Sequence, residues 1–341
     1  MGVRKSPVSI LFAFSALLAL SVPFSTFAKK GEGPREENTS SGPAVLWREP
    51  TDIASRDLFY GPGGKAHEPP QGTFVFVKED LDGTNPKFVV RDQDGVKWKV
   101  KLGLEARPET VASRLAWAVG YFVNEDYFVE NMQIQGMPAR LHRGQKLVAP
   151  DGTVYNVRLK RESKEEKKIG NWLWSNDPFT GTREWNGLRT LMAVINNWDL
   201  KDENNAVYKE GSENRYMVSD LGASFGSAGR TWPPDKAKGN LDSYGHARFI
   251  RKFNADSVDF AVPARPRFVY LVTPRDYFSR IRLESIGKNV PRKDARWMGQ
   301  MLARLSPAQI ADAFRAAGYS PQEVQRFSEV LRNRIEVLTD L

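Results

Sequence analysis

The chain of 341 residues contains no cysteine and only three histidines. The absence of cysteine excludes disulfide frameworks, thiolate metal sites and cysteine nucleophiles. The histidines, His67, His142 and His246, lie far apart without the spacing of zinc ligands, which argues against a histidine-built zinc site. Beyond residue 28 no apolar run is long enough to cross a membrane. The composition, 40% hydrophobic and 27% charged, is that of an ordinary globular protein.

The first 28 residues have the pattern of a secretory signal peptide. Arg4 and Lys5 precede an apolar run over residues 8–22, and Thr26 and Ala28 place small residues before a cleavage site after Ala28. The run is shorter than the roughly 20 residues that a membrane-spanning helix needs, so a cleaved signal is favoured over an uncleaved anchor. We therefore expect a secreted or periplasmic protein without a transmembrane segment after cleavage.

The net charge of the whole chain is +9, and removal of the two basic residues of the signal leaves +7. This mild basic bias fits either an anionic partner or a simple soluble surface. Residues 29–72 are rich in charge, glycine and proline and are expected to form a flexible lead-in. The stretch 61–65 resembles a phosphate loop but lacks its Gly-Lys-Ser/Thr ending, so a turn-rich loop is expected there.

Residues 73–170 have the pattern of a β-rich lobe. Turn sequences separate three runs of β-branched and aromatic residues, which predict consecutive antiparallel strands: 74–77, 88–90 and 96–102. A helix is expected to begin at Pro108, with Val111, Leu115 and Val119 on one face. Further strands are expected at 127–129 and 154–159, which gives a sheet of about five strands carrying one helix.

Residues 171–341 have helical signals instead. Thr182 can cap a helix, and Ser306 and Ser320 each begin a capping box with proline at the first helical position. The sequence thus predicts an α+β protein in which a small β-rich lobe is followed by a larger, mainly helical one.

Oxygen-bearing side chains gather in the helical half. Residues 206–208 and 216–218 are expected to form a hairpin; if its turn centres on Ser212, Asn204 opposes Asp220. Asp199 lies five residues before Asn204. Carboxylate and amide oxygens suit Mg²⁺, which shares its ligand sphere with substrate phosphates. Lys201 could neutralise a phosphoryl group during its transfer.

These residues resemble the protein-kinase-like superfamily. The run Asp-Leu-Lys-Asp-Glu-Asn at 199–204 is similar to the Asp-Leu-Lys-Pro-Glu-Asn catalytic loop, and Asp-Leu-Gly at 220–222 is similar to the metal-binding Asp-Phe-Gly. The resemblance implies a bilobal kinase-like fold. It would make Asp199 the catalytic base, Lys201 a contact of the γ-phosphate, and Asn204 and Asp220 the ligands of Mg²⁺.

The resemblance also implies a nucleotide site in the β-rich lobe. Lys101 would bind the α- and β-phosphates of ATP and pair with Glu109, and Gly83 would contact the nucleotide from the first turn. Lys99 remains an alternative to Lys101, because alternate lysines of this strand could all face solvent. Glu109 could instead be there only for its favourable effect on the helix dipole.

The sequence departs from ordinary protein kinases at several positions. It has no Gly-x-Gly-x-x-Gly and no Ala-Pro-Glu, Trp198 replaces the arginine before the catalytic aspartate, and Leu221 replaces phenylalanine. These departures point to atypical branches such as HipA-like, phosphatidylinositol-kinase-like or secretory-pathway kinases. The acceptor of the phosphoryl group, a protein, lipid or glycan, stays open.

Three functions fit these observations. The first is an exported, Mg²⁺-dependent phosphotransferase that uses ATP. The second is a pseudokinase, a non-catalytic binding module of the cell envelope, because the glycine loop is missing and nucleotides are expected to be scarce outside the cytoplasm. The third is an unrelated envelope protein with a basic surface for anionic polymers, in which Asp199 and Asp220 only make local turn hydrogen bonds. A nucleic-acid partner is not expected.

Overall fold

The computed structural model describes residues 42–83, 85–162, 167–197, 199–201, 204–227, 231, 234–262 and 274–341. The expected signal peptide, the first part of the lead-in and Trp198 lie outside these residues. Within them, every helix is too short or too polar to span a bilayer.

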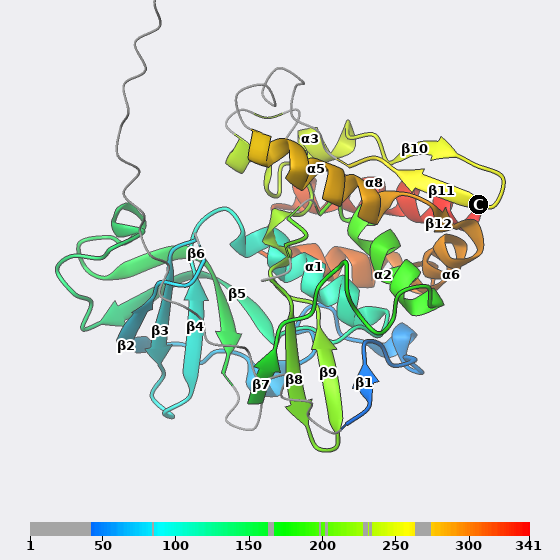
Figure 1. Cartoon of the computed structure of the whole chain (residues 1–341). Coiled ribbons are helices and arrows are strands. Elements are labelled where there is room, and N and C mark those ends of the chain that lie inside the picture. The colour runs from blue at the N-terminus through cyan, green and yellow to red at the C-terminus, as the bar shows by residue number, and fades with distance from the viewer. Residues whose placement is uncertain are drawn as a thin grey trace, which may run out of the picture. The chain divides into compact units, whose positions relative to one another are not determined.

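Five strands of the N-terminal half form a closed barrel in the order β2-β3-β4-β6-β5 (Figure 1). Their bounds are Thr73–Asp80 (β2), Lys87–Arg91 (β3), Lys97–Lys101 (β4), Asp126–Gln135 (β5) and Thr153–Arg161 (β6). Apolar side chains alternate into the interior, among them Phe88, Val100 and Leu159, which are fully buried. The neighbours are antiparallel except β2 and β5, whose short parallel pairing closes the barrel. The antiparallel strands were expected from the sequence, and the closure is what the structure adds.

Helix α1 (Ala106–Ala118) connects β4 to β5 and lies against both β5 and β6. On its other side it contacts helix α7 (Pro307–Arg315) and the short turn η5 (Leu221–Ala223). Because it has neighbours all round, even polar residues such as Glu109 and Arg114 are buried. The helix begins two residues before the expected Pro108.

The C-terminal half is mainly helical. Its helices are α2 (Arg183–Val194), α3 (Leu241–Gly245), α5 (Pro274–Gly287), α6 (Arg292–Ala303), α7 and α8 (Pro321–Thr339). Two small sheets accompany them. One has the order β1-β9-β8-β7, with strands Ala44–Val45, Glu213–Met217, Ala206–Glu210 and Lys167–Gly170. The other has the order β10-β11-β12, with strands Ile250–Phe253, Ser257–Phe260 and Val290–Pro291.

The expected helix caps are confirmed. The hydroxyl of Thr182 accepts a hydrogen bond from the backbone of Trp185 at the start of α2. Ser306 and Ser320 both form complete capping boxes at the starts of α7 and α8. The α+β architecture and the two-part layout that the kinase-like resemblance implied are thus present.

The expectation of a flexible lead-in is wrong for residues 42–72. Strand β1 pairs in parallel with β9, and Leu46, Ile53 and Leu58 are buried in the main core. The side-chain amide of Gln309 on α7 donates to two backbone carbonyls of this segment, those of Ile53 and Arg56. The segment is held by isolated apolar anchors between turns, and such anchors leave no periodic pattern in a sequence.

Candidate functional site

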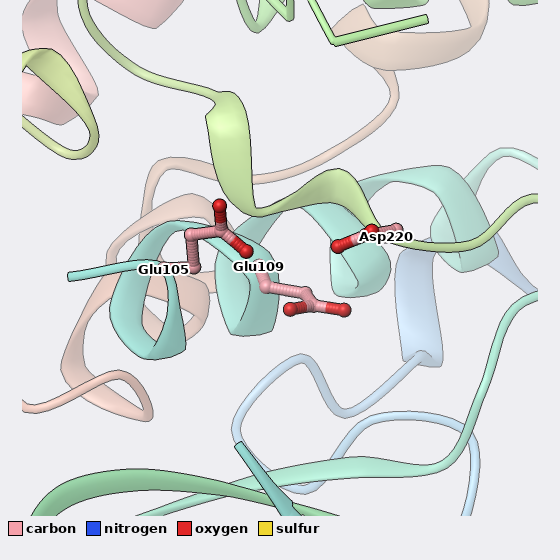
Figure 2. A group of neighbouring side chains, drawn as sticks. All are labelled: Glu105, Glu109 and Asp220. Carbon is pink, nitrogen blue, oxygen red and sulfur yellow. The ribbon is translucent and has the colours of Figure 1, made fainter. Parts of the chain in front are cut away.

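Lys101 lies at the centre of a buried ion cluster. Its ammonium group contacts Glu109 at 2.7 Å, Glu105 at 3.1 Å and Asp220 at 2.5 Å. The three carboxylates come within 4.8 Å of one another (Figure 2). The Lys101 side chain is only 4% exposed. The pairing of Lys101 with Glu109 that the resemblance implied is therefore present.

Local geometry explains how these groups meet. Lys101 is the last residue of β4, and the chain turns at once into α1, where Glu105 and Glu109 are one helical turn apart. Both carboxylates therefore lie on the face of the helix that is turned toward the end of the strand. Lys99, the alternative from the sequence, pairs instead with Asp80 at 2.8 Å and is 32% exposed. The structure thus brings Lys101, and not Lys99, to Glu109.

Charged partners favour the ionised forms of Lys101 and Glu105, whereas burial raises the pKa of Glu109 in spite of Arg158 and Lys101. Burial by itself lowers the pKa of Lys101, but the carboxylates of Glu109, Asp220 and Glu105 outweigh it, so the pKa is raised. Burial raises the pKa of Glu105, whereas Lys101 and Lys238 lower it, and the result is a pKa of about 2. Glu105 also pairs with Lys238 at 2.7 Å and accepts a hydrogen bond from Asn85.

Arg158 holds Glu109 from the barrel side. Its guanidinium donates to Glu109 at 2.7 Å and lies 3.3 Å from Asp126. Burial lowers the pKa of Arg158, but Asp126 and Glu109 raise it by more. With one carboxylate oxygen toward Arg158 and the other toward Lys101, Glu109 is fixed in orientation. Sequence analysis missed both Arg158 and Glu105. The available signals were an arginine inside the apolar strand Val154–Leu159 and the four-residue spacing of Glu105 from Lys101.

Asp220 enters the cluster from the segment after β9. Its backbone is left-handed, with φ of 55°, a conformation that aspartate tolerates better than most residues. The carboxylate is thereby directed toward α1, as Figure 2 shows. Gly222 allows this close approach, since a β-carbon there would lie 2.5 Å from the β-carbon of Glu105.

The predicted register of the hairpin is wrong by one residue. Glu210 faces Glu213 and Ala206 faces Met217, so the loop consists of Gly211 and Ser212 alone. Gly211 has φ of 60°, which suits a two-residue loop that begins with glycine. In this register Asn204 would lie opposite position 219 and not Asp220, and both residues lie beyond the paired strands. Strand pairing therefore does not place Asn204 opposite Asp220.

The predicted catalytic loop forms a second group of contacts. The carboxylate of Asp199 pairs with Lys201 at 2.8 Å, and the side-chain nitrogen of Asn204 donates to the backbone carbonyl of Asp199. Asn197 accepts a hydrogen bond from the backbone nitrogen of Asp199. The Asp199 carboxylate is 29% exposed and is therefore accessible to solvent.

The turn between β2 and β3 contains Gly83, which was expected to contact a nucleotide. Gly83 has φ of 64°, and its carbonyl accepts a hydrogen bond from Arg143. Asn85, two residues on, reaches Glu105 of the ion cluster at 2.6 Å. Side-chain hydrogen bonds thus hold the turn on both sides of position 84, and on one of these sides Asn85 connects it to the ion cluster.

Asn204 and Asp220, the metal ligands that the resemblance implied, each present an oxygen that can accept a further partner. The amide nitrogen of Asn204 donates to the Asp199 carbonyl, so its oxygen is the atom that could bind a cation. One oxygen of Asp220 faces Lys101, and the other can accept a second partner. Carboxylate and amide oxygens are the ligands that Mg²⁺ takes, together with water and phosphate.

Comparisons with known proteins give a weak likeness to kinases. No family model matches the chain, and no curated protein matches its sequence. Among solved structures, the proinflammatory kinase CtkA of Helicobacter pylori is 13% identical with a TM-score of 0.45, over 80% of this chain and 98% of that one. The Golgi casein kinase is 11% identical with a TM-score of 0.32, over 77% and 72%. A structure of the Golgi casein kinase with Mn and ADP bound gives 10% and 0.30, over the same shares. At such scores these likenesses carry no argument about function, which has to rest on the side chains themselves.

Proposed function

We propose that this protein is a phosphotransferase of kinase-like fold that depends on a nucleotide, ATP, and on a divalent metal ion, Mg²⁺. The observation that supports it most is the contact of Lys101 with both Glu109 and Asp220. In protein kinases the pairing of a strand lysine with a helix glutamate, and the placement of the metal-binding aspartate, are both required for catalysis.

The residues of this chain would have the following roles in the reaction. Lys101, oriented by Glu109, would bind the α- and β-phosphates, and Asn204 and Asp220 would hold the metal ion. The metal would neutralise the charge of the triphosphate. Asp199 would accept the proton of the acceptor hydroxyl, and Lys201 would offset the charge of the group in transfer. The acceptor is a protein, lipid or glycan hydroxyl.

A second candidate, a pseudokinase, is favoured by one observation. An ammonium group has three N–H donors. The ammonium of Lys101 already contacts three carboxylates, those of Glu105, Glu109 and Asp220. A phosphate can bind Lys101 only if one of these carboxylates moves away. A chain in which none moves would keep the fold and bind no nucleotide productively.

Thermal unfolding in the presence of nucleotide distinguishes a nucleotide-binding protein from one with an unrelated function. ATP with Mg²⁺, at about 100 times its dissociation constant, is expected to stabilise the protein by about 2.7 kcal/mol. Lys101→Met should abolish this gain, whereas Lys97→Met, an exposed lysine of the same strand, should keep it. Identical melting curves with and without saturating nucleotide and metal would contradict the proposal.

Transfer of labelled phosphate separates an active enzyme from a pseudokinase. Wild-type protein is expected to label itself or an added acceptor, and Asp199→Asn should reduce the rate by at least about a hundredfold. Asp242→Asn, at an exposed carboxylate of α3, is the matched control. Nucleotide binding without any transfer, in wild type and Asp199→Asn alike, would favour the pseudokinase.

We also propose that the chain is exported to the periplasm or secreted, on the evidence of the basic and apolar pattern of residues 1–28. N-terminal sequencing of the exported protein is expected to begin at Lys29. A product that keeps Met1 in the cytosolic fraction would contradict this.

A further inference from the structure

A cavity lies at the beginning of α1, and none of the residues proposed for phosphoryl transfer lines it. Its volume is about 540 Å³, within the range of small-molecule sites. Its walls come from the loop before α1, the η3 turn (Gln145–Leu147), strand β6, the segment after η6 (Pro234–Ala237) and the start of α8. Elements from both halves of the chain thus enclose it.

Cations predominate in the wall of this cavity. Arg107, Lys146 and Lys238 line it, against one carboxylate, Glu323. The guanidinium of Arg107 lies over the rings of Phe128 and Tyr319, at 5.7 and 5.3 Å. Such stacking uses the face of the guanidinium and leaves its N–H donors directed sideways. Because Lys238 is paired with Glu105, the wall has one cation more than it has carboxylates, and this surplus suits an anion.

Apolar side chains border the same cavity. Leu104, Leu147 and Tyr155 are 57%, 42% and 58% exposed, which is unusual for side chains of their size. They offer an apolar wall beside the cationic one. The ligand therefore has a charged end and an apolar body.

We propose that this cavity binds a small phosphate monoester with an aryl or alkyl group. Arg107 and Lys146 bind the phosphate, and Leu104 and Leu147 contact the apolar group. Lys238 connects the cavity to the ion cluster, because its ammonium pairs with Glu105, and Glu105 pairs with Lys101. The phosphate and Glu105 thus compete for Lys238, and occupancy of the cavity changes the surroundings of Lys101.

Calorimetric titration of the full chain with phenyl phosphate tests the proposal, with inorganic phosphate and phenol as partial probes. Phenyl phosphate is expected to bind more tightly than either part. Arg107→Met should weaken it about tenfold, as the loss of a hydrogen bond to a charged group does. Lys146→Met should weaken it about two- to fivefold. Lys236→Met, at an exposed lysine near Lys238, should bind as wild type does.

Glu105→Gln is the most specific variant in this experiment. It removes the carboxylate that competes with phosphate for Lys238, so it should tighten the binding of phenyl phosphate. Binding of phenyl phosphate should also persist with saturating ATP and Mg²⁺, whether or not the protein proves to be a kinase. Displacement by ATP, or equal affinities of Arg107→Met, Lys146→Met and Lys236→Met, would overturn the proposal. If Arg107→Met proves unstable, the exposed Lys146 keeps the test decisive.

Discussion

The side chain of Glu105 occupies the space that a β-carbon on Gly222 would need. The added atom would lie 2.5 Å from the β-carbon of Glu105 and 2.8 Å from its γ-carbon. These atoms are close to the backbone of α1 and cannot swing away as the end of a flexible side chain can. The glycine of the Asp-Leu-Gly motif is thus required by helix α1, and Glu105, Gly222 and Asp220 are positioned together.

Gly222→Ala should therefore destabilise the protein by about 1–3 kcal/mol, as overpacking of a core does. It should also disturb the contact of Asp220 with Lys101. Thermal unfolding measures the loss. Gly170→Ala is the matched control, because no atom lies within 4 Å of its added β-carbon and the change should stay within about 0.5 kcal/mol. Equal melting temperatures for the two variants would contradict the packing argument.

Lys101→Met should leave Glu105, Glu109 and Asp220 without their shared cation. Breaking a buried ion pair on one side costs about 3–5 kcal/mol. In the variant the buried carboxylates of Glu105 and Glu109 are easier to protonate, so its deficit relative to wild type should shrink as the pH falls below about 5. Urea unfolding at several pH values measures this. A deficit that stays constant from pH 7 to pH 4 would show that the cluster is not ionised as described.

Glu105→Gln gives a second pH test. The folded-state pKa of Glu105 is lowered to about 2, below its unfolded value of about 4.3. Its ionisation therefore stabilises the fold above the unfolded pKa, by up to about 3 kcal/mol, and this contribution is lost as the pH falls toward 2. The difference in unfolding free energy between wild type and Glu105→Gln should thus be largest above pH 5 and decline below pH 4. A difference that grew on acidification would refute the assignment.

Arg158 and Glu109 should be strongly coupled in a double-mutant cycle. Arg158→Met alone leaves Glu109 and Asp126 short of a cation, and Glu109→Gln alone leaves Arg158 and Lys101 with one carboxylate fewer. We expect the double variant to be more stable than the sum of the two losses by at least about 1 kcal/mol. Additive losses would show that Arg158 does not position Glu109.

Local rules sufficed for much of the architecture. The capping boxes at Ser306 and Ser320, the cap at Thr182 and the strands on either side of residues 94–95 are set by neighbours a few residues away. The same rules could not predict the packing of residues 42–72. Ile53 and Leu58 are buried in the core against residues distant in the sequence, and the segment has no repeating apolar pattern of its own. These rules also did not predict the hairpin register, since the register depends on which two residues form the turn.

For the candidate site, the sequence by itself determined which residue types were available: a strand lysine, a helix glutamate, and aspartates and an asparagine in two short motifs. Only the tertiary structure decided that Lys101, and not Lys99, is buried among carboxylates, and that Glu105, Arg158 and Lys238 belong to the same network. The physical reason is that a buried charge is stable only with partners close by. Those partners come from a barrel strand, a helix and a segment more than a hundred residues away, and no local pattern in the sequence records their distances.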